Sequence, residues 1–171
     1  MSEPYQLACL ITHDLPAEQG IRRCHRILGE EGISISDDSL IALHDTDIEE
    51  PEPEIITNEE FALQRLISWP TLGSIDYSGP EGMVTVSYFG PPGQGLLTCV
   101  LVSALERAVD RTNALPRYRH LGSRLHTELT AQRTIMEWGL EMRGFSYLAE
   151  IERLLSGDFD GEYPLLDLRR G

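Results

Sequence analysis

The segment 73–89, "GSIDYSGPEGMVTVSYF", constrains the fold of this chain more than any other. Ile75 and Tyr77 alternate with polar residues, and apolar and polar residues alternate again over 84–88. Alternation with a period of two indicates a strand with one buried face, and two such runs around a Gly-Pro-Glu-Gly turn predict an antiparallel hairpin. The fold must therefore contain a sheet with antiparallel pairing.

The N-terminal part predicts a strand and then a helix that covers the sheet. Residues 5–12 have the length of a strand, and their continuous apolar run over 7–11 is typical of a strand buried on both faces. Residues 16–32 begin with a proline and acidic residues and end at a glycine, which are helix boundary signals. The apolar residues of this helix lie on one stripe, so it should pack through one face: Ile21, Cys24, Ile27 and Leu28. Segments 33–36 and 39–44 then predict a short hairpin.

The second half predicts mainly helices. Segment 96–112 begins with residues that are apolar all round, which favours a central buried helix and leaves a strand over 96–102 open. Segment 115–144 predicts a long helix, and segment 145–157 predicts another that ends at a glycine. The long helix should bury one row of side chains: Leu121, Leu125, Leu129, Ile135, Met136 and Leu140. Segment 162–168 predicts an edge strand, because its proline cannot donate a ladder hydrogen bond.

These patterns predict one α+β domain over residues 1–171. Its antiparallel or mixed sheet should pack with the amphipathic N-terminal helix and with a C-terminal helical cluster. An acidic, proline-containing loop should interrupt this fold at about 45–56.

That loop lies in segment 44–60, "HDTDIEEPEPEIITNEE", which holds eight carboxylates and no Arg. The end of the segment predicts a helix start, with Thr57 as N-cap and Glu60 at the third helical position. The rest should be extended, because it combines two prolines with mutual charge repulsion. Six carboxylates remain on this part: Asp45, Asp47, Glu49, Glu50, Glu52 and Glu54.

The charge distribution favours a basic protein as the partner of this loop. The formal net charge is −14. Residues 1–60 hold 15 Asp and Glu against 3 Arg, a net of −12, whereas residues 61–171 hold 13 against 11. Such a field repels nucleic acid phosphates and speeds encounter with a basic protein. The six carboxylates are therefore predicted to bind such a partner, as in a cytosolic immunity or inhibitor-type protein or an adaptor or chaperone.

A second interpretation keeps the acidic loop inside the molecule. Segment 106–133 is net basic. Its residues Arg117, Arg119 and Arg124 could form ion pairs with the acidic first third of the chain. The sequence leaves this alternative open.

A third interpretation concerns the glycine-rich loop 90–95, "GPPGQG", within a predicted strand–loop–helix order. The loop resembles the pyrophosphate loop of the GNAT acetyltransferases, whose pattern is Arg/Gln-x-x-Gly-x-Gly/Ala. Gly93 and Gly95 match, whereas Gly90 stands where Arg or Gln belongs. The resemblance implies a small transferase that binds acyl-CoA or a nucleotide phosphate through Gly93, Gln94 and Gly95.

Segment 156–167, "SGDFDGEYPLLD", resembles a calcium loop of the EF-hand kind. Its candidate ligands are Asp158, Asp160 and Asp167. A proline at the ninth position and an Asp in place of the final Glu depart from the pattern. The alternative is a Gly/Asp turn between a helix and an edge strand.

Composition excludes several kinds of chemistry. Lysine is absent, so the chain has no phosphate-loop lysine, Schiff-base lysine or lysine base. Neither G-x-S-x-G nor H-E-x-x-H occurs. We therefore predict no catalytic residue and no cofactor, which favours a non-enzymatic role.

The cysteines and the N-terminus favour a cytoplasmic protein. Cys9, Cys24 and Cys99 are widely spaced among apolar neighbours, as expected of buried free thiols. The N-terminal apolar run is too short for a signal peptide or a membrane span. The sequence does not indicate the oligomeric state.

Overall fold

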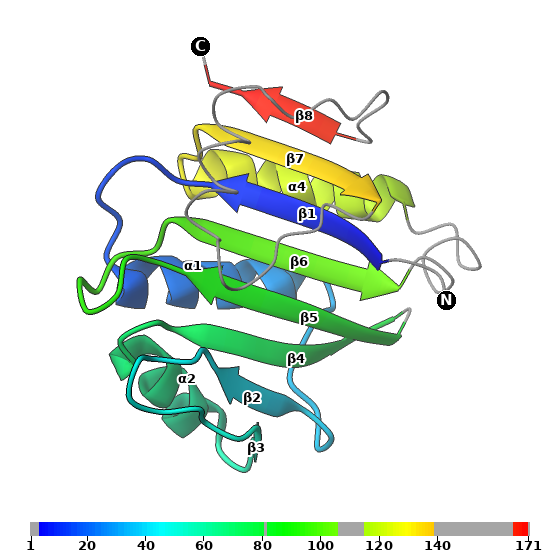
Figure 1. Ribbon diagram of the computed structural model, residues 1–171. Coiled ribbons are helices and arrows are strands. Elements are labelled where there is room, and N and C mark those ends of the chain that lie inside the picture. Colours follow the sequence, from blue (N-terminus) through cyan, green and yellow to red (C-terminus); the bar gives the residue numbers. More distant parts are fainter. Residues whose placement is uncertain (1–3, 81, 106–114, 139–165, 171) are drawn as a thin grey trace.

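An antiparallel sheet of eight strands forms the centre of the computed structural model, which describes residues 4–80, 82–105, 115–138 and 166–170 (Figure 1). The order across the sheet is β3-β2-β4-β5-β6-β1-β7-β8. The strands are β1 (Pro4–Leu10), β2 (Leu40–Leu43), β3 (Glu54–Ile55), β4 (Gly73–Gly79), β5 (Gly82–Phe89), β6 (Cys99–Leu105), β7 (Arg133–Trp138) and β8 (Leu166–Arg169). The predicted α+β class with an antiparallel sheet is confirmed.

Three helices within the described residues share one hydrophobic core with this sheet: α1 (Ala17–Glu30), α2 (Glu59–Ser68) and α4 (Leu115–Glu128). In Figure 1, α1 and α4 lie behind the sheet, and α2 lies beside β2. Among the described helices, none has the length and apolar content needed to cross a membrane.

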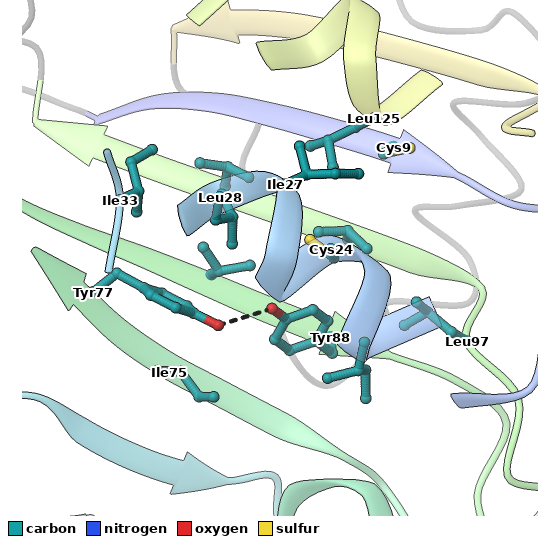
Figure 2. Packing of buried hydrophobic residues seen from close by; sticks show 14 of the residues in the cluster. Cys9, Cys24, Ile27, Leu28, Ile33, Ile75, Tyr77, Tyr88, Leu97 and Leu125 are labelled. Atoms are coloured by element: carbon teal, nitrogen blue, oxygen red, sulfur yellow. Dashed lines mark hydrogen bonds between the residues drawn. The ribbon is translucent and has the colours of Figure 1, made fainter. Parts of the chain in front are cut away.

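The predicted hairpin is the pair β4 and β5. Ile75 lies opposite Val86, and Tyr77 lies opposite Val84. This register turns the alternating apolar side chains to the same face, where they are buried. The predicted helix α1 packs on that face through its apolar stripe, and Figure 2 shows Cys24, Ile27 and Leu28 above the hairpin.

The predicted hairpin between 33–36 and 39–44 is wrong. Strand β2 pairs with β4 on one side and with β3 on the other. Ser34 instead forms an isolated bridge with Ser78 of β4. Strand β2 pairs with β4 over three residues, from Ile41 opposite Ile75 to Leu43 opposite Gly73. This long-range pairing replaces the predicted local hairpin with 33–36.

The predicted buried helix over 96–112 is also wrong where the structure describes it, because 99–105 forms β6. The strand alternative was the correct one. Strand β6 lies between β5 and β1, and Val100, Val102, Cys99 and Leu101 are all buried. A strand buried on both faces has a continuous apolar run, which periodicity cannot separate from a buried helix.

The long helix predicted over 115–144 ends early. Its row Leu121, Leu125 and Leu129 is buried, as predicted. Thr130 then has a φ of 53°, which ends the helical path, and residues 133–138 form β7. Ile135 and Met136 therefore belong to a strand. Leu140 and the helix predicted over 145–157 lie outside the described residues, whereas β8 is the edge strand expected near 162–168.

Two glycines give a matched test of this backbone. A Cβ atom on Gly90 would lie 1.8 Å from the Leu96 carbonyl oxygen, whereas one on the exposed helical Gly29 would meet nothing within 4 Å. Gly90→Ala should therefore lower the free energy of unfolding by about 2 kcal/mol or more. Gly29→Ala should raise it by about 0.5–1 kcal/mol, because alanine loses less backbone entropy in a helix. Urea unfolding of both variants measures the difference, and equal stabilities would contradict this account of the Gly90 loop.

Candidate functional site

The six predicted partner-binding carboxylates lie on one loop at an edge of the sheet. This acidic loop, residues 45–54, connects β2 to β3 and includes the first residue of β3 (Figure 1). Its first nine residues contain no helix or strand. Its geometry depends on the contacts of its two stems, which are His44 before the loop and residues 54–56 at its end.

His44 holds the first stem. Its backbone N–H donates to the Leu72 carbonyl at 2.9 Å. Its own carbonyl accepts from Trp69 Nε1 at 2.7 Å and from Thr71 Oγ1 at 2.8 Å. The imidazole stacks on Phe89 with 4.8 Å between the ring centroids. The chain therefore enters the acidic loop from a fixed point.

The imidazole hydrogen bonds of His44 define its protonation. Nδ1 lies 3.0 Å from the Thr71 carbonyl oxygen, which can only accept, so Nδ1 carries the hydrogen. Nε2 is then an acceptor for Ser74 Oγ at 3.3 Å. Burial lowers the pKa of His44, although the Thr71 hydrogen bond opposes this shift. The ring is therefore neutral at neutral pH.

The second stem is held by β3 and by helix α2. Ile55 pairs with Leu40 in the sheet. The buried Ile56 donates its N–H to the Ser39 carbonyl at 3.0 Å. Glu54 Oε2 accepts from Arg65 Nε of α2 at 2.8 Å. Glu54, one of the six predicted partner-binding residues, thus has a partner within the chain.

The other five carboxylates are exposed: Asp45, Asp47, Glu49, Glu50 and Glu52. Within the parts of the chain that the structure describes, their side chains form no hydrogen bond or ion pair. The tip of the loop is ordered by Thr46, whose Oγ1 accepts from the N–H groups of Ile48 and Glu49 at 3.3 and 3.0 Å. The structure therefore presents five unpaired negative charges on a loop with two fixed stems.

The alternative that Arg117, Arg119 and Arg124 bind the acidic loop does not match this geometry. All three residues lie on α4, which packs on β1, β7 and β8, away from the β3 edge (Figure 1). Arg124 does pair with acids of the first third of the chain, but these are Glu30 and Glu31 at the end of α1. The predicted internal ion pairing is thus right for Arg124 and does not involve the loop.

The acids that follow the loop have structural partners. The N-cap of α2 is Asn58, whose Oδ1 accepts from the N–H of Phe61 at 2.9 Å. The predicted cap, Thr57, is thus wrong by one residue, and Glu60 does not complete a capping box. Its carboxylate binds the Arg22 guanidinium at 2.6 Å, which lowers the pKa of Glu60.

His25 forms a second contact between α1 and α2 that the sequence did not reveal. Its Nε2 binds the carboxylate of Glu59, and its Nδ1 lies 2.9 Å from the hydroxyl of Tyr77. The Tyr77 hydroxyl lies 3.1 Å from that of Tyr88, as Figure 2 shows. These contacts border a cleft of about 460 Å³ between the two helices, lined by Arg22, His25, Arg26, Asn58, Glu59, Glu60 and Leu63. The partners are up to 52 residues apart in sequence, so no local pattern could predict the network.

The glycine-rich loop 90–95 does not start a helix but leads into strand β6. The N–H of Gly93 donates to the Pro70 carbonyl at 2.9 Å, and the carbonyl of Gly95 accepts from Ala17 at 2.7 Å. Gln94 is exposed. The loop borders a cavity of about 190 Å³ beside the end of α2. The helix N-terminus that the transferase hypothesis requires is therefore replaced by a strand.

Of the three candidate calcium ligands, Asp158 and Asp160 lie outside the described residues. Asp167 lies on β8, where both of its carboxylate oxygens lie 3.0 Å from the guanidinium of the buried Arg133. This contact lowers the pKa of Asp167. Among the residues with described positions, no group of three or more His, Cys, Asp or Glu could hold a metal ion.

The three cysteines are buried and free, as predicted. Burial raises the pKa of Cys9 and of Cys24 to about 12, and it raises the pKa of Cys99 as well. Because the thiolate is the reactive form, none of the three is suited to act as a nucleophile.

Comparisons with known proteins give a distant likeness among solved structures. No family model matches the chain. No curated protein matches it either. Among solved structures, the chain is similar to the Pseudomonas aeruginosa T6SS protein PA0821, with 11% sequence identity and a TM-score of 0.46. The match covers 79% of this chain and 39% of that one, so the chain spans well under half of its length. A likeness at this level carries no inference about function.

The His44 contacts predict a pH dependence of stability. The folded-state pKa of His44 lies below its unfolded value of about 6.5, so the unfolded chain binds the proton more readily. The stability from His44 is therefore fully present above about pH 6.5 and is lost as the pH falls through that value toward the folded pKa. Urea unfolding at about pH 7.5 and about pH 5.5 should show a larger loss for the wild type than for His44→Gln. Equal losses would contradict the assignment of a neutral, half-buried imidazole.

The pair of Arg133 and Asp167 predicts a local loss of stability. Asp167→Asn should lower the free energy of unfolding by about 2–3 kcal/mol, because it removes the charge of a carboxylate that binds the buried guanidinium through two hydrogen bonds. Arg169 also contacts Asp167, at 3.3 Å, but its side chain is 61% exposed. Arg169→Ala should therefore change stability by about 0.5 kcal/mol or less. Chemical denaturation of the two variants measures both values, and similar losses would show that burial of Arg133 does not decide the energy.

Proposed function

We propose that this chain is an acidic protein-binding module that engages a basic partner protein through the acidic loop. Its role would be that of an immunity or inhibitor-type protein, or of an adaptor or chaperone. The observation that carries the proposal is the set of five exposed carboxylates without partners among the described residues, on a loop whose stems are held by His44 and Glu54.

The fixed stems favour binding because they lower its entropic cost. A flexible acidic segment would have to be ordered when the partner binds, which reduces affinity. Here the hydrogen bonds of His44, the turn at Thr46 and the ion pair of Glu54 with Arg65 hold the loop before any partner arrives. The free energy gained from contacts with the partner is then not offset by the entropic cost of ordering the loop.

The charge favours a basic partner. Five carboxylates within eight residues repel one another, and a cationic surface would relieve that repulsion. Their field would also raise the rate of encounter, an effect that weakens as salt screens it. The first test is affinity capture from a lysate of the source organism at low and at high salt, followed by purification of the captured basic protein.

Reversal of charge on the loop gives the decisive measurement with that purified partner. Asp47→Arg/Glu50→Arg should lower the association rate by about tenfold or more at low ionic strength and flatten its dependence on salt. Stopped-flow or surface plasmon resonance measures both. The domain should remain folded, because both side chains are exposed and neither forms a hydrogen bond or ion pair among the described residues.

Asp14→Arg/Glu18→Arg is the matched control. It changes the net charge by the same amount with two exposed acids near the start of α1, of which Glu18 also forms an exposed ion pair with Arg22 of the same helix. Its effect on the association rate should be several times smaller than that of the loop variant. Equal effects would mean that total charge, and not the acidic loop, attracts the partner, and unchanged capture by the loop variant would refute the proposal.

A further inference from the structure

Exposed apolar side chains accompany the acidic loop. Four large apolar residues are highly exposed among those that the structure describes: Ile48 (91%), Ile55 (67%), Phe61 (67%) and Met83 (58%). The first three fall between residues 48 and 61, which form the acidic loop, β3 and the first turn of α2. We call Ile48, Ile55 and Phe61 the apolar edge. Single exposed apolar residues are ordinary, but three on adjoining elements along one edge of the sheet can mark an interface.

Ile48 is displayed rather than packed. The Thr46 N–H donates to the Glu49 carbonyl at 3.0 Å, and Thr46 Oγ1 accepts the N–H of Ile48. The side chain therefore stands at the tip of an ordered turn, with Asp47 and Glu49 as its direct neighbours. A partner would gain this apolar contact without having to order the turn.

Ile55 and Phe61 lie on neighbouring elements that are joined by an ion pair. Phe61 precedes Arg65 by one helical turn, so the two residues share a face of α2. Arg65 binds Glu54, which is adjacent to Ile55 on β3. Successive residues of a strand point to opposite faces, and Glu54 points to α2. A partner that contacts both Ile55 and Phe61 must therefore reach around the edge of the sheet.

The surrounding charge selects the occupant of this edge. Nucleic acid and anionic lipid would be repelled by the five unpaired carboxylates, and a second copy of the chain would bring like charges together. A protein surface with an apolar centre and a rim of Arg or Lys satisfies both the apolar and the acidic groups. Protein interfaces are commonly arranged in this way: the apolar core supplies most of the binding energy, and the charged rim raises the association rate.

We propose that the apolar edge supplies the anchors of the interface, and that the partner's contact surface is an apolar patch bordered by Arg and Lys. The inference rests on the proposed function and adds the recognition chemistry to it. The carboxylates then attract the partner, while Ile48, Ile55 and Phe61 hold it.

Two synthetic peptides of identical composition separate these roles. Both are made of Arg and Leu in equal numbers, one arranged as an amphipathic helix and the other scrambled so that it has no continuous apolar face. Fluorescence anisotropy at low and at moderate salt should show that the amphipathic isomer binds at least about tenfold more tightly, because both isomers carry the same charge. Ile48→Ser/Phe61→Ser should remove most of this preference and leave the salt-dependent affinity of the scrambled isomer unchanged.

Met83→Ser is the matched control, because it truncates an exposed apolar side chain at the far end of the β4–β5 hairpin. It should preserve the preference for the amphipathic isomer, and circular dichroism should show all variants folded. Equal binding of the two isomers, or a preference that survives Ile48→Ser/Phe61→Ser, would overturn the apolar edge. If peptide binding is nevertheless lost in Asp47→Arg/Glu50→Arg, the proposed function of the acidic loop stands, and only the role of the apolar edge is overturned. Absence of binding by both isomers at low salt would overturn the proposed function and this inference together.

Discussion

The contact between the hydroxyls of Tyr77 and Tyr88 begins the chain of polar contacts that connects the β4–β5 hairpin to α1 and α2. The register of β4 and β5 brings both rings under α1, where they are fully buried. A buried hydroxyl needs a partner, and Tyr77 also lies within hydrogen-bonding distance of His25 on α1. His25 in turn binds Glu59, the first residue of α2. One chain of polar contacts therefore runs from the centre of the core to the helix beside the acidic loop.

The acidic loop inherits its geometry from this arrangement. Its second stem depends on α2, because Glu54 binds Arg65 of that helix. Its first stem depends on the segment between α2 and β4, because His44 bonds to groups of Trp69 and Thr71. The second stem is thus held by α2 itself, and the first stem by the residues that connect α2 to the hairpin. The loop is ordered by its two stems and by the turn at Thr46, and its other five carboxylates remain exposed to solvent or a partner.

The parts of the fold that the sequence predicted are those with a strong local period. The hairpin and the buried stripe of α1 follow from periods of 2 and 3.6. Strand β6 was misassigned because burial on both faces removes the period, and β7 because Ile135 and Met136 happened to extend the apolar row of α4. The acidic loop was visible in composition alone. The contacts that hold it, from His44 to Thr71 and from Glu54 to Arg65, leave no local pattern.

The distribution of ion pairs separates the structural acids from the acids of the loop. Most of the paired acids connect two elements, such as Glu60 with Arg22, Glu54 with Arg65, Glu30 and Glu31 with Arg124, and Asp167 with Arg133. The five other carboxylates of the loop form no hydrogen bond or ion pair among the described residues, although Glu49 acts electrostatically on Arg65. Neutral residues could link β2 to β3 without the repulsion of five like charges, so the charges are not needed for folding. Their mutual repulsion destabilises the folded state slightly. A bound basic surface would relieve this repulsion, and the relief would contribute to the binding free energy.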